Sequence, residues 1–167
     1  MLLPEDLMRK LRRIFCFSKI DLADAYLQIK LAPESQRRLA LSTHKGVLLQ
    51  TRLPFGITSA PGYFQEIMDK LTCDLPGVAV YLDDILVSGT TADEHLRNLR
   101  NLLQRLQERD LKCNQRKCVF AQPSVEYLGH QLTRNGIEKG NHVDAVTKMP
   151  PPTNVSSLRS FLGSVQF

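Results

Sequence analysis

The chain has 167 residues, of which 43% are hydrophobic, and it carries a formal net charge of +5. This composition is typical of one globular domain and excludes a disordered chain, and no apolar run reaches the roughly 18 residues of a membrane span. The basic balance favours polyanionic partners, nucleic acid first, and the N-terminus lacks the basic and apolar regions of a signal peptide.

The first third of the sequence alternates short helical and extended patterns. Apolar residues recur at helical spacing in the first element and alternate with polar residues in the second. A turn over 44–46, which ends in glycine, separates the two members of a strand pair. The predicted elements are a helix over 4–13, a strand over 15–22, one or two helical turns over 23–29, and strands over 39–43 and 47–52.

Two longer helices are predicted after a loop over 53–56. Thr58 or Ser59 can cap the first of them, and Pro61 suits its first turn. The second and longest helix begins after Thr91 with a capping-box pattern and runs to about residue 109. Its apolar stripe consists of Leu96, Leu99, Leu103 and Leu106.

The remaining sequence predicts strands over 113–120 and 125–132, a hairpin turn at Asn135-Gly136, and helical pieces over 143–149 and from Val155 onward. Strands and helices follow one another without strict βαβ alternation. The sequence therefore predicts an α+β fold with a largely antiparallel sheet.

Two adjacent acids, Asp83 and Asp84, lie between apolar runs that are typical of buried strands, 78–82 and 85–87. A tight turn between strands usually contains Asn-Gly or Asp-Gly, because both central residues need a positive φ. Adjacent carboxylates repel each other, and a divalent metal that prefers hard oxygen ligands, Mg²⁺ or Mn²⁺, would neutralise them. The alternative interpretation is a solvated turn that happens to be acidic.

A third acid, Asp21, comes at the end of the strand predicted over 15–22. If this strand lies beside the hairpin of Asp83 and Asp84, three carboxylates meet at one edge of the sheet. Such a cluster can hold two divalent ions and support an in-line phosphoryl displacement. We therefore expect these acids on adjacent strands, with their carboxylates close to a shared point. The four cysteines follow no zinc-ligand spacing and are expected to be reduced thiols.

Five motifs, in order across nearly the whole chain, resemble those of gypsy-type retrotransposon reverse transcriptases. They are Phe17-Ser18-Lys19-Ile20-Asp21-Leu22 with Tyr26-Leu27-Gln28-Ile29; Leu53-Pro54-Phe55-Gly56 with Ala60-Pro61 and Phe64-Gln65; Tyr81-Leu82-Asp83-Asp84; Lys117-Cys118 and Phe120 with Tyr127-Leu128-Gly129-His130; and Ser157-Leu158-Arg159-Ser160-Phe161-Leu162-Gly163. The resemblance implies an RNA-directed DNA polymerase with a palm-type α+β fold, an antiparallel sheet backed by helices.

The resemblance also implies a role for each motif residue. The catalytic and metal-binding set would be Asp21, Asp83 and Asp84 with the backbone carbonyl of Leu22, holding two Mg²⁺ or Mn²⁺ ions, and Lys117 as a general acid near the leaving pyrophosphate. The nucleotide-binding set would be Leu22, Tyr26, Phe55, Gly56 and Leu82, with Tyr26 blocking a 2′-hydroxyl. The primer end would be held by Tyr127, Leu128 and Gly129.

Several of these residues have a purely structural alternative. Tyr26 can be a core aromatic residue, Gly56 a plain turn glycine, and Lys117 a solvated surface lysine. The segment 127–129 can be an ordinary hairpin.

The implied domains are a palm with a fingers remnant over 1–137 and the start of a truncated thumb over 138–167. The expected partners are a primed RNA or DNA template, deoxynucleoside triphosphates, and the rest of a Pol polyprotein or a partner subunit, inside the cytoplasm, a virus-like particle or the nucleus. Few residues precede Asp21, so the fingers cations of the family are not matched, and Ala25 stands where the family often has glycine. These departures leave open a catalytically inactive retrotransposon-derived fragment that at most binds nucleic acid.

Overall fold

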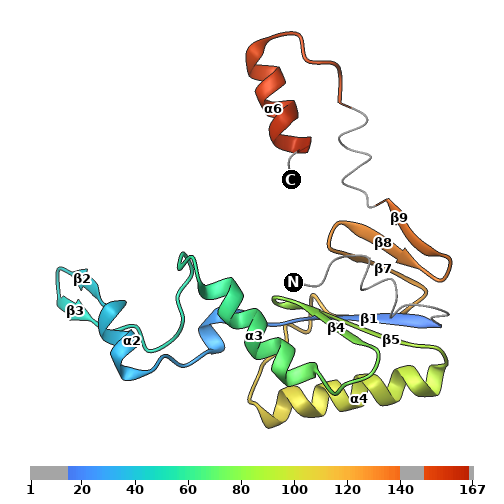
Figure 1. Ribbon diagram of the computed structural model, residues 1–167, viewed down its shortest axis with the longest axis horizontal. Helices are drawn as coiled ribbons and strands as arrows, with labels where there is room; N and C mark the ends of the chain where they lie inside the picture. Colours follow the sequence, from blue (N-terminus) through green and yellow to red (C-terminus); the bar gives the residue numbers. More distant parts are fainter. Residues whose placement is uncertain (1–14, 140–148, 166–167) are drawn as a thin grey trace.

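The centre of the fold is an antiparallel sheet of four strands in the order β4-β5-β1-β6 (Figure 1). The computed structural model describes residues 15–139 and 149–165. The strands are β1 (Cys16–Asp21), β4 (Val78–Tyr81), β5 (Asp84–Gly89) and β6 (Val119–Gln122). The predicted α+β fold with an antiparallel sheet is confirmed, whereas the helix predicted over 4–13 and nearly all of the one over 143–149 lie outside the described residues.

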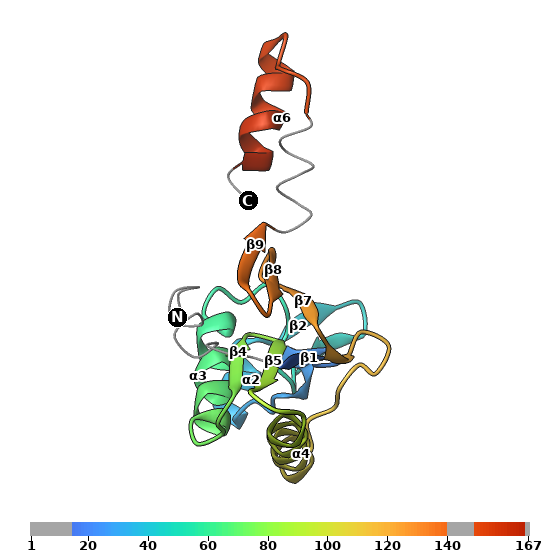
Figure 2. The ribbon, with the colours of Figure 1, turned by 90° about the vertical axis from the view of Figure 1, so that its right-hand side faces the viewer.

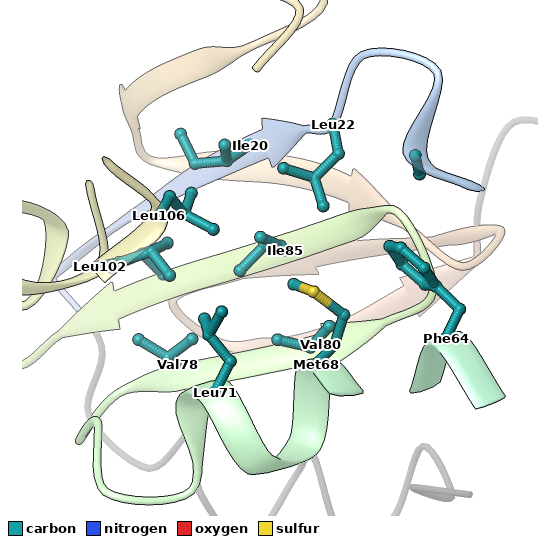
Figure 3. Close-up of a cluster of buried hydrophobic side chains, with 12 residues drawn as sticks. Ile20, Leu22, Phe64, Met68, Leu71, Val78, Val80, Ile85, Leu102 and Leu106 are labelled. Carbon is teal, nitrogen blue, oxygen red and sulfur yellow. The ribbon is translucent and has the colours of Figure 1, made fainter. Parts of the chain in front are cut away.

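Two helices cover one face of this sheet. α3 (Ala60–Thr72) packs beside β4, and α4 (Ala92–Glu108) packs across β5 and β1. Because side chains alternate between the faces of a strand, every second residue of β1, β4 and β5 points toward these helices. Figure 3 shows the resulting core, whose buried members include Ile20, Val78, Val80, Ile85, Phe64, Met68, Leu71, Leu102 and Leu106.

A second antiparallel sheet covers the opposite face. It consists of β7 (Ser124–Tyr127), β8 (His130–Thr133) and β9 (Gly136–Lys139), in that order. Its buried residues pack against side chains of the first sheet; the cluster comprises Val125, Tyr127, Leu132, Phe17, Ala79 and Leu86. The single strand predicted over 125–132 is wrong, because Leu128 and Gly129 both have positive φ, 50° and 75°, and reverse the chain. The strand predicted over 113–120 begins only at Val119.

Smaller elements lie outside these two sheets (Figures 1 and 2). They are the 3₁₀-helix η1 (Ala25–Gln28), α2 (Pro33–Arg38), β2 (Leu41–Thr43), β3 (Gly46–Leu48) and α6 (Val155–Val165). The predicted strand pair around 44–46 and the helix starting at Val155 are confirmed. α2 escaped prediction because it buries no residue and so shows no apolar periodicity. No helix in the described part of the chain is long and apolar enough to cross a membrane.

The buried face of α4 differs from the predicted leucine stripe. Leu96 is 55% exposed, whereas the polar residues His95 and Asn98 are buried. Nε2 of His95 lies 2.8 Å from the hydroxyl of Ser18, and the amide of Asn98 donates to the carbonyl of Ser88 at 2.9 Å. Partners on the strands thus bind Nε2 of His95 and the amide of Asn98, two polar side chains that the leucine stripe did not include.

Gly89 lets α4 approach β5 closely. A Cβ on this residue would lie 2.5 Å from the backbone nitrogen of His95, so strand or helix would have to move. We expect Gly89→Ala to lower the free energy of unfolding by about 1–3 kcal/mol, measured by urea denaturation. Gly62→Ala in α3 is the matched control, because a Cβ there meets nothing within 4 Å and should leave stability unchanged or higher. Equal effects of the two substitutions would contradict this close packing.

Candidate active site

β1 and β5 bring three acids to one edge of the central sheet. Asp21, the last residue of β1, lies directly opposite Asp84, the first residue of β5, and Asp83 precedes it in the β4–β5 turn. The prediction that these acids lie on adjacent strands is confirmed. Directly opposed residues point to the same face, so the side chains of Asp21 and Asp84 lie on the face that β7–β9 cover.

The three acids differ in their surroundings. Asp21 is buried with 8% of its surface exposed, Asp84 is partly buried, and Asp83 is exposed. Burial raises the pKa of Asp84, the ion pair with Lys19 opposes that rise, and the charges of Asp83 and Asp21 add to it. The surroundings of Asp84 thus disfavour its charged form even with Lys19 beside it.

Two lysines lie against these acids. Nζ of Lys19 is 3.1 Å from Oδ1 of Asp84, and Nζ of Lys117 is 3.7 Å from Oδ2 of Asp21. The side chain of Lys117 is 66% exposed, whereas that of Lys19 is 24% exposed. The structure therefore places Lys117 beside Asp21, and it adds a second, less exposed lysine.

The donor set at this edge suits a hard divalent cation. It consists of the three carboxylates and the backbone of Leu22, whose N–H donates to the carbonyl of Asp83 at 3.1 Å. Such oxygen ligands are those that Mg²⁺ and Mn²⁺ prefer. The expected convergence on one point is not seen: within the described residues, no three His, Cys, Asp or Glu side chains form a group that could hold a metal ion. Asp21 and Asp84 pair with lysines instead.

Gln65 of α3 holds the turn that carries Asp83. The loop has two residues, Leu82 and Asp83, and only Leu82 has a positive φ, 53°, where the sequence led us to expect two. The Leu82 N–H donates to Oε1 of Gln65 at 2.7 Å. Nε2 of Gln65 donates to the carbonyl of Val80 at 3.2 Å and to Oδ1 of Asp69 at 2.7 Å. A left-handed leucine costs on the order of 1–3 kcal/mol, so the turn needs such support.

We expect Gln65→Leu to loosen this turn without unfolding the protein. Leucine fills a similar volume but leaves the Leu82 N–H without its acceptor, at a cost of about 1–3 kcal/mol. Amide exchange at Leu82, followed by NMR, should accelerate by about tenfold or more. Gln104→Leu on α4 is the control, because Gln104 is exposed and bonds to Glu108 of its own helix. Unchanged protection of Leu82 in the Gln65 variant would remove Gln65 from this role.

Tyr26 belongs to an aromatic cluster beside the acids. Its ring centroid lies 5.3 Å from those of Phe55 and Phe64. Burial raises the pKa of Tyr26, and the charge of Asp83 adds to the shift, so the hydroxyl lies in the field of the acidic edge. Phe55 is 64% exposed, and Gly56 has a φ of 87° with open space where a Cβ would project. The structure thus brings Tyr26, Phe55 and Asp83 near one another.

The residues predicted to hold a primer end form the β7–β8 turn. Tyr127 is 1% exposed, and its hydroxyl donates to the backbone carbonyl of Asp84 at 3.3 Å. Burial raises its pKa strongly. Leu128 is partly buried and Gly129 is exposed. Tyr127 is therefore a core residue that ties this turn to the acidic edge, and the turn itself is the accessible part.

The sequence assigned no role to Lys19 or Gln65, although both stand inside quoted motifs. The spacing of two between Lys19 and Asp21 was a usable signal, because it puts both side chains on one face of a strand. The position of the polar Gln65 directly after the buried Phe64 was a weaker signal. Nothing in the sequence shows that its side chain bonds to the backbone of the β4–β5 turn.

Comparison with known proteins gives this geometry a context. The family model described as reverse transcriptase (RNA-dependent DNA polymerase) matches residues 3–132. The uncharacterized protein K02A2.6 of Caenorhabditis elegans is 39% identical over 163 residues, which cover 98% of this chain and 13% of that protein. The transposon Tf2-3 polyprotein of Schizosaccharomyces pombe is 32% identical over 168 residues, which cover 99% of this chain and 13% of that polyprotein. The chain thus spans only a small part of these relatives.

Solved structures of a foamy viral protease-reverse transcriptase share the fold. The dRH form in complex with ds DNA superposes with a TM-score of 0.86 at 27% identity and covers 100% of this chain and 30% of that one. The complex with an RNA/DNA hybrid superposes with a TM-score of 0.81 at 27% identity, and the match covers 94% of this chain and 21% of that one. The central sheet with α3 and α4 is accordingly a palm-like fold. Motifs, fold and matched residues agree, and this chain belongs to the reverse transcriptase family.

Proposed function

We propose that this domain is the RNA-directed DNA polymerase of a gypsy-type retrotransposon, which adds deoxynucleotides to a primer 3′ end by two-metal phosphoryl transfer. The observation that carries the proposal is the register of β1 and β5, which sets Asp21 opposite Asp84 with Asp83 in the adjoining turn. Family membership and the similarity to a transposon polyprotein support it.

The acidic edge is the proposed metal site, with Asp21, Asp83, Asp84 and the carbonyl of Leu22 as ligands of two Mg²⁺ or Mn²⁺ ions. When bound, such ions lower the pKa of an attacking hydroxyl and stabilise charge on a leaving pyrophosphate. The chain itself positions the oxygens. The Leu22 N–H bond to the Asp83 carbonyl joins β1 to the turn, and the carbonyl of Asp21 accepts from the Asn114 N–H at 2.8 Å. Phosphoryl transfer asks mainly for such positioning and charge stabilisation.

The aromatic cluster is the proposed nucleotide site. Tyr26, packed between Phe55 and Phe64, would exclude a ribose 2′-hydroxyl. Phe55 and Leu82 would contact the incoming nucleotide, and the open space at Gly56 would let a base approach the backbone.

The remaining motif residues flank the acids. Lys117, 3.7 Å from Asp21, would act as general acid toward the leaving pyrophosphate. The Leu128-Gly129 turn, anchored by Tyr127, would hold the primer end beside Asp84. We further propose that residues 1–137 form the palm with fingers elements and 138–167 the start of a thumb, acting inside the cell with the rest of a polyprotein or a partner subunit.

The test is primer extension by the purified chain on a primed RNA template with deoxynucleoside triphosphates and Mg²⁺. We expect extension that depends on Mg²⁺, and binding of the primed template that weakens steeply with salt, because contacts to phosphates dominate. Titration of a labelled primed template at low and moderate salt gives the binding separately from the synthesis.

A second candidate function is nucleic-acid binding without catalysis. It is favoured by the pairing of Asp21 and Asp84 with lysines in place of a converged carboxylate group. Tight template binding without any extension in Mg²⁺ or Mn²⁺ would decide for this alternative and against the polymerase.

A further inference from the structure

Lys19 forms the shorter of the two ion pairs at the acidic edge. Its ammonium lies 3.1 Å from Oδ1 of Asp84, and the two side chains are 24% and 26% exposed. Strand geometry fixes the pair: Lys19 lies opposite Leu86 on β5, so it shares a face with Asp21 and meets Asp84 on the diagonal. The pair therefore follows from the fold and does not depend on a mobile surface chain.

Charge balance shows what the pair does for this edge. The three carboxylates of Asp21, Asp83 and Asp84 face the two ammonium groups of Lys19 and Lys117, which leaves a single negative charge. Lys117 is mostly exposed and its contact is the longer one, 3.7 Å, so its contribution is screened by water. Lys19 is thus the main internal neutralising charge beside the partly buried Asp84.

We propose that Lys19 is an internal counter-ion of the active site, which competes with divalent cations for the carboxylate of Asp84. The inference rests on the proposed function, because it takes the acidic edge to be the metal site. The ammonium of Lys19 and a divalent cation at the same carboxylate repel each other, so the charge of Lys19 opposes metal binding when Asp84 becomes a ligand. Without a divalent cation, Lys19 keeps the like charges of the edge from destabilising the fold.

The size of the competition follows from Coulomb's law. Charges of +1 and +2 about 6 Å apart in water repel each other enough to change an affinity roughly tenfold. A neutral side chain at position 19 should therefore bind Mg²⁺ about ten times more tightly. The same change should lower the stability of the protein without Mg²⁺, and added Mg²⁺ should recover more stability than it does in the unsubstituted chain.

The experiment compares Mg²⁺ binding by calorimetry, and thermal unfolding with and without Mg²⁺, for the full chain and its variants. Lys19→Met keeps the aliphatic stem and removes the charge, and Lys19→Gln is a second neutral variant should methionine fold poorly. Lys19→Arg retains the cation and should bind Mg²⁺ as the unsubstituted chain does. Lys45→Met is the charge-matched control, because Lys45 is exposed at the tip of the β2–β3 hairpin.

The outcomes separate this inference from the proposed function. Tighter Mg²⁺ binding in the neutral variants alone supports the competition. If the unsubstituted chain binds Mg²⁺ and the neutral variants bind it equally or more weakly, Lys19 does not compete, and the polymerase proposal stands. Absence of Mg²⁺ binding from every variant overturns the metal site and the role of Lys19 together.

Discussion

Asp83→Asn is expected to abolish DNA synthesis, with a loss of about a thousandfold or more in the rate of primer extension. Asparagine keeps the size and one oxygen of the side chain but removes the negative charge, and a neutral amide does not replace a charged metal ligand. A loss of about 4 kcal/mol in transition-state stabilisation corresponds to three orders of magnitude in rate. The measurement is single-turnover extension of a primed RNA template with Mg²⁺.

The structure indicates that this variant folds. The side chain of Asp83 is exposed, and the hydrogen bond of Asp83 to the Leu22 N–H uses the backbone carbonyl, which the substitution leaves in place. Asp93→Asn, at another exposed acid in the first turn of α4, controls for the change of net charge and should extend normally. Retention of more than a tenth of the rate by Asp83→Asn would contradict the role of this acid.

Tyr26→Ala should lower the preference for deoxynucleotides over ribonucleotides by about a hundredfold. The tyrosine ring is fixed by Phe55 and Phe64 and lies near Asp83, where the sugar of an incoming nucleotide would meet it. Removing the ring removes the steric barrier to a 2′-hydroxyl, and specificity depends on the difference in transition-state binding between the two substrates.

The measurement is the ratio of the kcat/KM values for the two nucleotides. A loss of stability in Tyr26→Ala lowers both values by the same factor, so it does not change their ratio. Tyr26→Phe keeps the ring and is expected to keep the selectivity, which makes it the matched control. An unchanged ratio in the alanine variant would show that Tyr26 is a core aromatic residue and no gate.

Local chemistry made several features predictable from the sequence. Thr91 was expected to cap the long helix, and its hydroxyl accepts from the Glu94 N–H at 3.2 Å. The acidic pair was expected in a turn between two buried strands; Asp83 lies in the β4–β5 turn, and Asp84 is the first residue of β5. Each of these features depends on residues that are adjacent in the chain, so a short stretch of sequence is enough to predict it.

Features that depend on distant segments were not predictable. The buried face of α4 was misjudged because Ser18 and Ser88, far away in the chain, are hydrogen-bond partners of Nε2 of His95 and of the amide of Asn98. The single strand over 125–132 was wrong, whereas the alternative of a hairpin at 127–129 is confirmed by the antiparallel pairing of β7 with β8. Hydrophobic patterning records the polarity of a residue but not the partner that compensates it.

For this protein the sequence by itself determined most of the elements, the order of the motifs and the presence of three acids at or beside strand ends. Only the tertiary structure decided that Asp21 lies directly opposite Asp84, that Gln65 supports the left-handed Leu82, and that Lys19 pairs with Asp84. The physical reason is that register and helix docking are set by the packing of two cores on the faces of one sheet. That packing couples residues dozens of positions apart, and a periodic pattern within one segment cannot encode it.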